Sequence, residues 1–291
     1  MRAKSGKNRN APSRPHKSGR PQRARPSAQG PGPAAPKPPS GGHFLWGRHA
    51  VMAALANPDR RIAALYGSGD SGEEMQRFIS GLPASRQQDL PPIHDSDRRR
   101  LDALQPAGDG DKAVHQGMAA AVWPLESPDL ASFLASTTAD RQRILLLDQL
   151  SDPRNVGAII RSALALGASA IIATHRNAPE ESGALARAAV GALERVPMIR
   201  VVNLARAIET CQEAGFTVAG LAGEGAQDVG SLAQIDRLAL VMGAEGSGLR
   251  HLTRKHCDML VRIEISENSE SLNVSTAAAI ALYAAGPGSA P

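Results

Sequence analysis

Three short segments in the second half of the chain hold polar side chains and glycines whose types and spacing suit ligand binding. They are residues 152–157 followed by Arg161, residues 242–248, and residues 271–275. Each segment comes at the end of an apolar run that is typical of a β-strand. Proteins that alternate strands and helices build their binding sites at such strand ends. The three segments together therefore predict a binding site.

The first segment opens a helix and carries an amide and a guanidinium. Asp152 is a good helix cap and Pro153 suits the first helical position, so Asn155 falls in the first turn. The apolar stripe that this helix would bury consists of Val156, Ile159, Ile160, Ala163 and Leu164. Arg161 lies off that stripe. Viewed alone, Asn155 is explained equally well as a capping residue, and Arg161 as a charge in solvent.

The second segment is a glycine-rich loop that does not match the loops of common nucleotide-binding proteins. Gly243, Gly246 and Gly248 are spaced G-x-x-G-x-G, whereas dinucleotide-binding loops read G-x-G-x-x-G, and there is no Walker A sequence. A second Gly-rich strand end at 220–225 indicates a ligand that lies against backbone rather than in a cage of charges. The glycines can also serve tight turns alone, and Glu245 can simply favour the start of a helix.

The third segment begins the last expected helix with small polar side chains. Either Ser271 or Asn273 can cap that helix. One cap would be enough, so the additional polar groups beside an Ala-rich helix indicate a polar pocket.

The elements that position these segments alternate between strands and helices from Arg143 onward. The expected strands are 144–147, 170–173, 198–201, 217–221, 238–242 and 259–263. The expected helices are 154–166, 181–190, 203–214 and 273–284, with glycines ending the first and third. This pattern predicts an α/β domain over 143–286, in which helices cover both faces of a parallel sheet.

A smaller α/β domain is expected over residues 43–122. Its expected elements are helices 48–56, 72–81 and 95–104 and strands 62–66 and 118–122. Two prolines and a polar run mark residues 123–142 as a linker, which contains a short helix near 129–136.

Residues 1–42 contain ten Lys or Arg and no Asp or Glu. The other residues hold 23 basic against 28 acidic side chains, so the basic character of the chain belongs to this arm. A basic segment rich in Pro and Gly buries too little apolar surface to fold, and we expect it to be disordered and to meet phosphate non-specifically. A solubility tail without a specific partner remains the alternative. The prolines argue against a mitochondrial transit peptide.

Composition disfavours several other classes of protein. We expect no membrane span, no signal peptide and no DNA partner, and therefore a cytoplasmic protein. Cys211 and Cys257 are isolated, and we expect them to be reduced and structural. No metal site is expected, because His251, His256 and Cys257 lack the spacing of zinc ligands. Eight aromatic residues leave no obvious base-stacking surface.

The three segments, in this order, resemble the motifs of the SpoU (TrmH) family of RNA ribose 2′-O-methyltransferases. The matching patterns are Asp-Pro-x-Asn-x-Gly with a following Arg, Met-Gly-x-Glu-Gly-x-Gly, and Ser-Leu-Asn-Val-Ser, and the resemblance covers roughly 143–285. Upstream, residues 46–51 and 115–117 resemble the ribosomal-protein-L30-like substrate domain of this family. The pairing looks most like bacterial 23S rRNA guanosine 2′-O-methyltransferases.

The resemblance implies a SPOUT catalytic domain with a carboxy-terminal trefoil knot, bound S-adenosylmethionine, and a homodimer with composite active sites. By matching position, Gly243, Ile263 and Leu272 would contact the cofactor. The residues that would form the catalytic cluster are Asn155, Arg161, Glu245, Ser271 and Asn273. A guanidinium stays protonated in proteins, so Arg161 would hold a phosphate or the developing alkoxide rather than act as a base.

Two alternatives to 23S rRNA methylation remain open. One is ribose methylation of tRNA or of another rRNA nucleotide, and the other is a catalytically silent RNA-binding assembly factor. One departure from the family bears on the RNA target: the loop before Ser271 carries Glu264, Glu267 and Glu270, which should repel phosphate. The basic arm would compensate by raising the local concentration of RNA.

Overall fold

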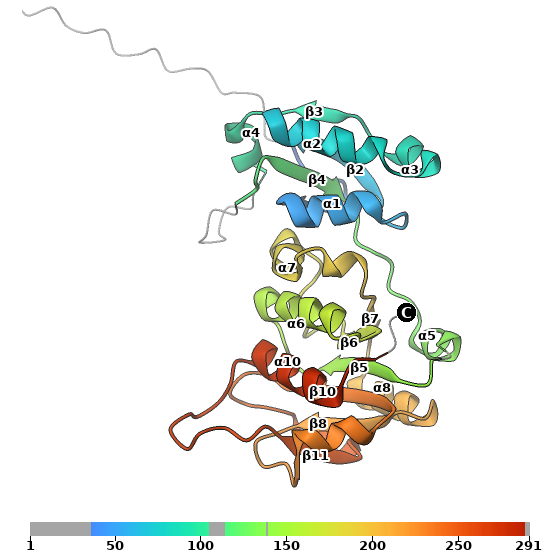
Figure 1. Cartoon of the computed structure of the whole chain (residues 1–291), viewed down its shortest axis with the longest axis vertical. Helices are drawn as coiled ribbons and strands as arrows, with labels where there is room; N and C mark the ends of the chain where they lie inside the picture. The colour runs from blue at the N-terminus through green and yellow to red at the C-terminus, as the bar shows by residue number, and fades with distance from the viewer. Residues whose placement is uncertain (1–35, 105–113, 138, 289–291) are drawn as a thin grey trace, which may run out of the picture. The chain divides into compact units, whose positions relative to one another are not determined.

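The computed structural model describes residues 36–104, 114–137 and 139–288 of the 291-residue chain (Figure 1). Most of the expected basic arm, residues 1–35, lies outside this described part. Residues 36–42 belong to it and form neither helix nor strand. No helix in the described part is long and apolar enough to cross a membrane.

The first sheet has four strands and forms a small mixed α/β domain. Its strands are β1 (His43–Trp46), β4 (Met118–Val122), β2 (Ile62–Gly67) and β3 (Ile93–Asp95), in this spatial order. The β1–β4 and β4–β2 pairs are antiparallel, and the β2–β3 pair is parallel. The helices are α1 (Arg48–Ala56), α2 (Gly69–Ser80), α3 (Ala84–Asp89) and α4 (Arg98–Asp102).

One prediction for this domain was wrong, and three of its elements were not predicted. The expected helix 95–104 is instead the end of β3 followed by the short helix α4. The break falls there because the Asp97 side chain accepts a hydrogen bond from the Arg100 amide and so caps a new helix. Strands β1 and β3 and helix α3 had no predicted counterpart, since all three are too short for periodicity to reveal them.

The second sheet has seven strands, and every neighbouring pair is parallel, as predicted. Its spatial order is β7 (Met198–Val201), β6 (Ala170–Thr174), β5 (Gln142–Leu147), β10 (Arg237–Met242), β8 (Thr217–Leu221), β11 (Met259–Arg262) and β9 (Gln227–Asp228). The helices are α5 (Leu130–Ser136), α6 (Pro153–Ala165), α7 (Gly183–Ala189), α8 (Leu204–Glu213), α9 (His251–His256) and α10 (Val274–Ala285). Two short 3-10 helices cover Ala192–Glu194 and Val229–Gln234.

Alternation along β5 shows which helices cover which face of this sheet. Leu145 and Leu147 share an apolar core with residues of α6, α7 and α10, whereas Ile144 and Leu146 share a second core with residues of α5 and α8. Successive side chains of a strand point to opposite faces. Helices therefore cover both faces, as predicted, with α6, α7 and α10 on one and α5 and α8 on the other.

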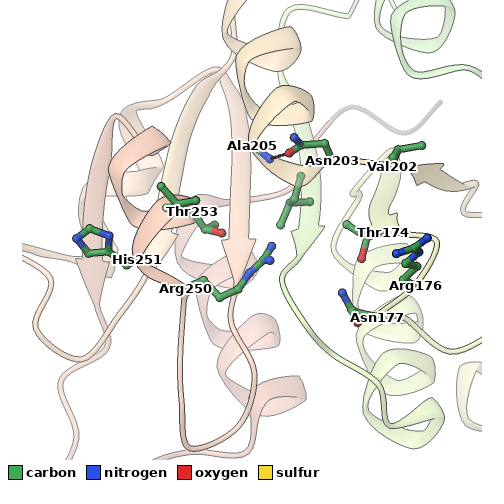
Figure 2. A pocket seen from close by; sticks show the side chains of 11 residues that line it. Thr174, Arg176, Asn177, Val202, Asn203, Ala205, Arg250, His251 and Thr253 are labelled. Carbon is green, nitrogen blue, oxygen red and sulfur yellow. Dashed lines mark hydrogen bonds between the residues drawn. The ribbon is translucent and has the colours of Figure 1, made fainter.

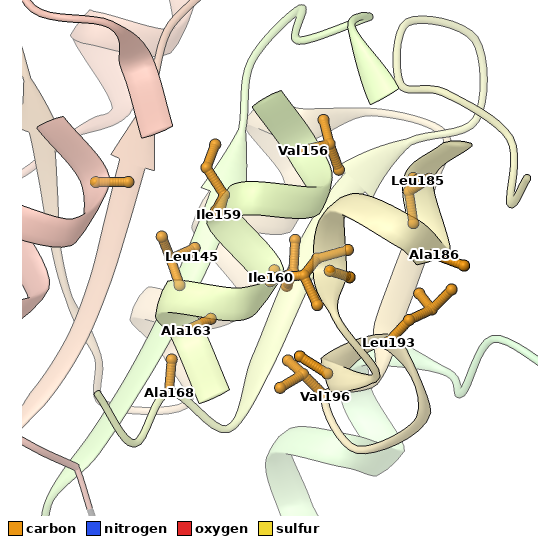
Figure 3. Close-up of a cluster of buried hydrophobic side chains, with 14 of the residues drawn as sticks. Leu145, Val156, Ile159, Ile160, Ala163, Ala168, Leu185, Ala186, Leu193 and Val196 are labelled. Carbon is orange, nitrogen blue, oxygen red and sulfur yellow. The ribbon is translucent and has the colours of Figure 1, made fainter. Parts of the chain in front are cut away.

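The apolar stripe of α6 packs as its spacing predicts. Val156, Ile159 and Ile160 are buried and lie toward the side chains of α7 and of the strands (Figure 3). Each fully buried aliphatic side chain contributes roughly 1.5–3 kcal/mol of stability. Gly157 permits this contact, because a Cβ there would lie 2.6 Å from the Leu185 carbonyl oxygen. The packing fixes the start of α6, and with it Asn155, relative to the sheet.

Candidate functional site

The functional segments meet at the carboxyl edge of the seven-stranded sheet. Strands β5 and β10 are parallel neighbours, so the loops that follow them leave from the same edge. The loop after β5 leads to α6, where the Asp152 side chain caps the helix by accepting from the Arg154 amide at 2.9 Å. The prediction for this cap is confirmed. The cap and the buried stripe place Asn155 in the first turn, facing the other loops.

Asn273 joins the three segments through its side chain. Its Nδ2 donates to Asn155 Oδ1 at 3.0 Å and to Glu245 Oε1 at 2.6 Å. Its Oδ1 accepts from the Ser275 amide at 2.9 Å and from the Ser275 hydroxyl at 2.6 Å, and so caps α10. Asn273 is therefore both the helix cap and the centre of a polar cluster, which we call the amide cluster: Asn155, Glu245 and Asn273.

The loop that carries Glu245 folds back on itself at very short range. The Ala244 carbonyl accepts from the Gly248 amide at 2.8 Å, and the Glu245 carbonyl from the Ser247 amide at 3.0 Å. Gly243 lies against the backbone of Gly248, where an added Cβ would come within 2.2 Å. The backbone of Gly248 therefore leaves no room for a side chain at position 243. Glycine is needed there because the chain at 243 lies against the chain at 248.

An ion pair between a buried carboxylate and an exposed arginine ties this loop to the strand beside it. Asp148 directly follows β5 and is fully buried. Its Oδ1 accepts from Arg250 Nε at 2.7 Å, and its Oδ2 from the Arg250 amide at 3.1 Å. The sequence interpretation missed this pair, because an Asp after a strand is also what an ordinary turn contains. Charge-assisted bonds from a buried carboxylate hold the loops of Asn155 and Glu245 in fixed relation.

Comparison with known proteins decides the family. The family model for the SpoU rRNA methylase family matches residues 142–283. The 23S rRNA (guanosine-2′-O-)-methyltransferase RlmB of Escherichia coli K12 is 38% identical over 245 residues, which cover 83% of this chain and 97% of that protein. The protein of the same name from Pseudomonas putida is 35% identical over 243 residues, covering 83% and 94%.

The chain belongs to the SpoU rRNA methylase family. The resemblance drawn from the three motifs is thereby confirmed. The crystal structure of the SpoU methyltransferase AviRb from Streptomyces viridochromogenes in complex with AdoMet matches the fold with a TM-score of 0.67. It is 23% identical and covers 84% of this chain and 90% of its own, so the likeness concerns the fold alone.

Within this SpoU chain, two of the five residues predicted for the catalytic cluster lie apart from the amide cluster. Arg161 follows Asn155 by six residues on α6, which turns it about 120° around the helix and about 9 Å along it. Its side chain is exposed, and no hydrogen bond or ion pair joins it to the amide cluster in the described part of the chain. Ser271 is also exposed, and its carbonyl accepts from the Ser269 hydroxyl at 3.3 Å.

Two of the three residues predicted to contact a cofactor lie next to the amide cluster in sequence. Gly243 precedes Glu245 in the folded-back loop, and Leu272 precedes Asn273. Ile263 and Leu272 are partly buried apolar residues that pack against the core beneath α6 and α10. Their remaining exposed surface is apolar, and it suits a ligand that lies against backbone and aliphatic side chains.

Charges around the site are uneven. Glu264, Glu267 and Glu270 are all exposed in the loop between β11 and α10, and Arg262 pairs with the first of them at 3.3 Å.

No group of three metal-ligating side chains occurs among the described residues. Burial raises the pKa of both Cys211 and Cys257 to about 12, so these free thiols stay protonated at neutral pH. Neither thiol is therefore a nucleophile here.

Proposed function

We propose that this protein transfers a methyl group from S-adenosylmethionine to a guanosine ribose 2′-hydroxyl in 23S rRNA. The observation that carries the proposal is the amide cluster, because three segments far apart in the sequence bring their polar side chains to one point. The RlmB relatives named above match this chain over both of its domains, which favours the same RNA class. The tRNA alternative has no observation that favours it.

The residues around the amide cluster fit the cofactor. Gly243 lies in a loop whose backbone turns back at contact distance, and Ile263 and Leu272 offer apolar surface. S-adenosylmethionine supplies an electrophilic methyl group on a sulfonium, so the reaction needs alignment more than a strong protein nucleophile. We infer that Gly243, Ile263 and Leu272 hold the cofactor largely through backbone, and that the loops there form the family's trefoil knot.

Each polar residue then has a distinct role. Asn155 and Asn273 orient the ribose, since their amides can donate to and accept from hydroxyl groups. Glu245 fixes Asn273 through the 2.6 Å hydrogen bond and thereby keeps the cluster ordered. Arg161 holds the neighbouring phosphate or the developing alkoxide, because its guanidinium remains charged. Ser271, on the exposed loop, lies where it would meet ribose or cofactor.

A homodimer with composite sites accounts for the position of Arg161. On its own chain this residue lies about 120° around α6 and about 9 Å along it from Asn155, so we infer that a second copy supplies the guanidinium. Ile280 and Tyr283 of α10 are exposed apolar residues at helical spacing, the latter 79% exposed. Such a surface favours association between copies. We propose that Arg161 of each protomer completes the site of its partner.

The smaller domain supplies a further contact with RNA in this proposal. We infer that residues 43–122 form the ribosomal-protein-L30-like substrate domain, joined by the linker 123–142 to the catalytic domain 143–286. The three consecutive arginines Arg98, Arg99 and Arg100 are exposed on α4, which suits contact with phosphates. The arm 1–42 would add non-specific attraction to RNA. A protein that methylates 23S rRNA would act in the cytoplasm, and we infer that location for this chain.

The decisive experiment is methylation of deproteinised 23S rRNA with labelled S-adenosylmethionine, followed by mapping of the modified ribose. We expect one 2′-O-methylguanosine in 23S rRNA and no label in tRNA. An Asn155→Ala variant that still binds the cofactor in calorimetry serves as the matched control and should transfer no label. Cofactor binding without transfer by the wild-type protein would support the silent RNA-binding factor instead. Label in tRNA alone would overturn the choice of substrate.

A further inference from the structure

A pocket lies at the carboxyl edge of the same sheet, beside strands β6 and β7, which the proposed catalytic site does not use. It is a cavity of about 550 Å³ between the loops that follow β6 and β7 and the start of α9. Figure 2 shows Thr174, Arg176 and Asn177 on one side and Arg250 and Thr253 on the other. The carboxyl edge of a parallel sheet is where α/β proteins bind ligands.

The charges of this pocket select an anion. Arg176, Arg250 and His251 line it, and none of the described residues that line it is Asp or Glu. The nearby carboxylate of Asp148 is fully buried and already holds Arg250 through Nε and the backbone amide. The terminal nitrogens of Arg250 have no other partner in the described part of the chain. They form an oriented donor pair, which is the geometry that recognises phosphate.

A buried hydroxyl in the wall supports the presence of a ligand. Thr174 ends β6 and is only 7% exposed, yet its Oγ1 has no hydrogen-bond partner among the described residues. Buried polar groups in folded proteins nearly always have a partner, and leaving one without costs free energy. An acceptor oxygen entering the pocket would satisfy this hydroxyl.

The rim of the pocket is apolar, which distinguishes a nucleotide from a bare anion. Val202 is 91% exposed and Leu252 is 65% exposed, and both line the opening. Exposed aliphatic side chains beside a cationic wall match a ligand with one charged end and one flat apolar end. A phosphate with its base and sugar has this character.

We propose that this pocket holds one nucleotide of the substrate RNA that flanks the methylated residue, with its phosphate on Arg176 and Arg250 and its base or sugar against Val202 and Leu252. This inference rests on the proposed function. Arg250 follows Glu245 by five residues, so the pocket lies within about 18 Å of the amide cluster along the chain. A stretch of a few nucleotides spans that distance. The pocket would thus extend the substrate site along the strand.

The test compares Arg176→Glu and Thr174→Val with Arg195→Ala. Arg195 is an exposed arginine before β7, at the opposite edge of the same sheet, and serves as the matched control. For Arg176→Glu we expect a rise in KM for 23S rRNA of at least ten-fold, with kcat and the Kd for S-adenosylmethionine within two-fold of wild type. The slope of log K against log salt should fall by about 0.7–0.9, the loss of one phosphate contact.

Thr174→Val removes the hydroxyl while keeping the shape, so KM should rise about three-fold without a loss of thermal stability. Arg195→Ala should leave KM and the salt slope unchanged. If wild type methylates RNA but Arg176→Glu keeps both its KM and its slope, the inference is overturned while the proposed function stands. Binding of inorganic phosphate or free AMP that depends on Arg176, with an unchanged KM for RNA, would equally overturn it. A wild-type protein that transfers no label instead refutes the proposed function itself.

Discussion

The two ends of strand β5 place arginines in opposite circumstances. At the amino end, Arg143 is fully buried and donates to the carbonyls of Asp236, Ala285 and Gly286 at 2.6, 2.8 and 3.2 Å. Arg141 adds bonds to Ala233 and Ala285. On α6, the helix that follows the carboxyl end, Arg161 is exposed and has no hydrogen bond or ion pair within the described part of the chain.

This difference suggests that Arg141 and Arg143 stabilise the fold, whereas Arg161 is available to a ligand. The amino-end arginines satisfy the last carbonyls of α10, which carry the negative end of the helix dipole and would otherwise lack donors. Arg143 places all three of its guanidinium nitrogens on backbone carbonyls. At the carboxyl edge of the sheet, Asn273 donates to Asn155 and Glu245. Arg161, in contrast, donates to no residue in the described part of the chain. Substitutions at the two ends should therefore affect different measurements.

The largest expected effect is on folding, from Arg143→Ala. This change removes the hydrogen bonds from Arg143 to the carbonyls of Asp236, Ala285 and Gly286 and leaves a cavity where a fully buried side chain stood, so we expect the free energy of unfolding to fall by roughly 3–5 kcal/mol. Urea denaturation followed by circular dichroism measures it. Burial lowers the pKa of Arg143 to about 10, so the residue stays charged and the loss should be constant between about pH 6 and 9. A variant as stable as wild type would show that these bonds are not needed.

The next effect is on catalysis, from Arg161→Ala. We expect kcat to fall about 10²- to 10³-fold, because a guanidinium aimed at developing charge is lost, while the urea midpoint stays unchanged. Mixing this variant with Asn155→Ala by unfolding and refolding together tests the composite site. Heterodimers would then contain one intact site, and about a quarter of wild-type activity should return. No recovery would place Arg161 in the site of its own chain.

The contrast between Arg143 and Arg161 also shows what can be predicted from the sequence alone. Except for the short elements β9 and α9, which were not predicted, the strands and helices from Arg143 onward follow from apolar runs and from glycine and cap positions, because local propensity and burial agree there. Arg143 and Arg161 look alike in sequence, since each is one charge beside an apolar run. What separates them is contact with α10, more than a hundred residues later. The same holds for the bond between Asn155 and Asn273, which spans 118 residues.

Some site features have a sequence signal that is too common to interpret. Asp148 follows an apolar strand, and many turns begin with Asp, so its burial and its bonds to Arg250 become visible only in the fold. The motif resemblance pointed to Asn155, Glu245 and Asn273 together, and the structure places them in contact. It pointed also to Arg161, which a single chain leaves apart from the others.

A smaller effect is expected at the ion pair between Asp148 and Arg250, which links the loops. Asp148→Asn keeps the shape but places an amide group against one of the two donors from Arg250, and we expect a loss of stability of about 2 kcal/mol. The Kd for S-adenosylmethionine should rise as well, because the loop carrying Gly243 loses its anchor. Calorimetry and urea denaturation measure both. Arg195→Ala, on the opposite edge of the sheet, is the control and should change neither quantity.

The smallest expected effect tests whether Glu245 only positions Asn273 or also contributes its charge to catalysis. Its Oε1 accepts from Asn273 Nδ2, and a glutamine carbonyl oxygen can accept the same bond without the charge. Glu245→Gln should therefore lower kcat only about five- to ten-fold, near 1 kcal/mol, and leave the urea midpoint unchanged. Glu245→Ala, which removes the acceptor, should lose more. If the glutamine variant were as inactive as the alanine variant, Glu245 would act through its charge, and the proposed site would require two charged groups rather than Arg161 alone.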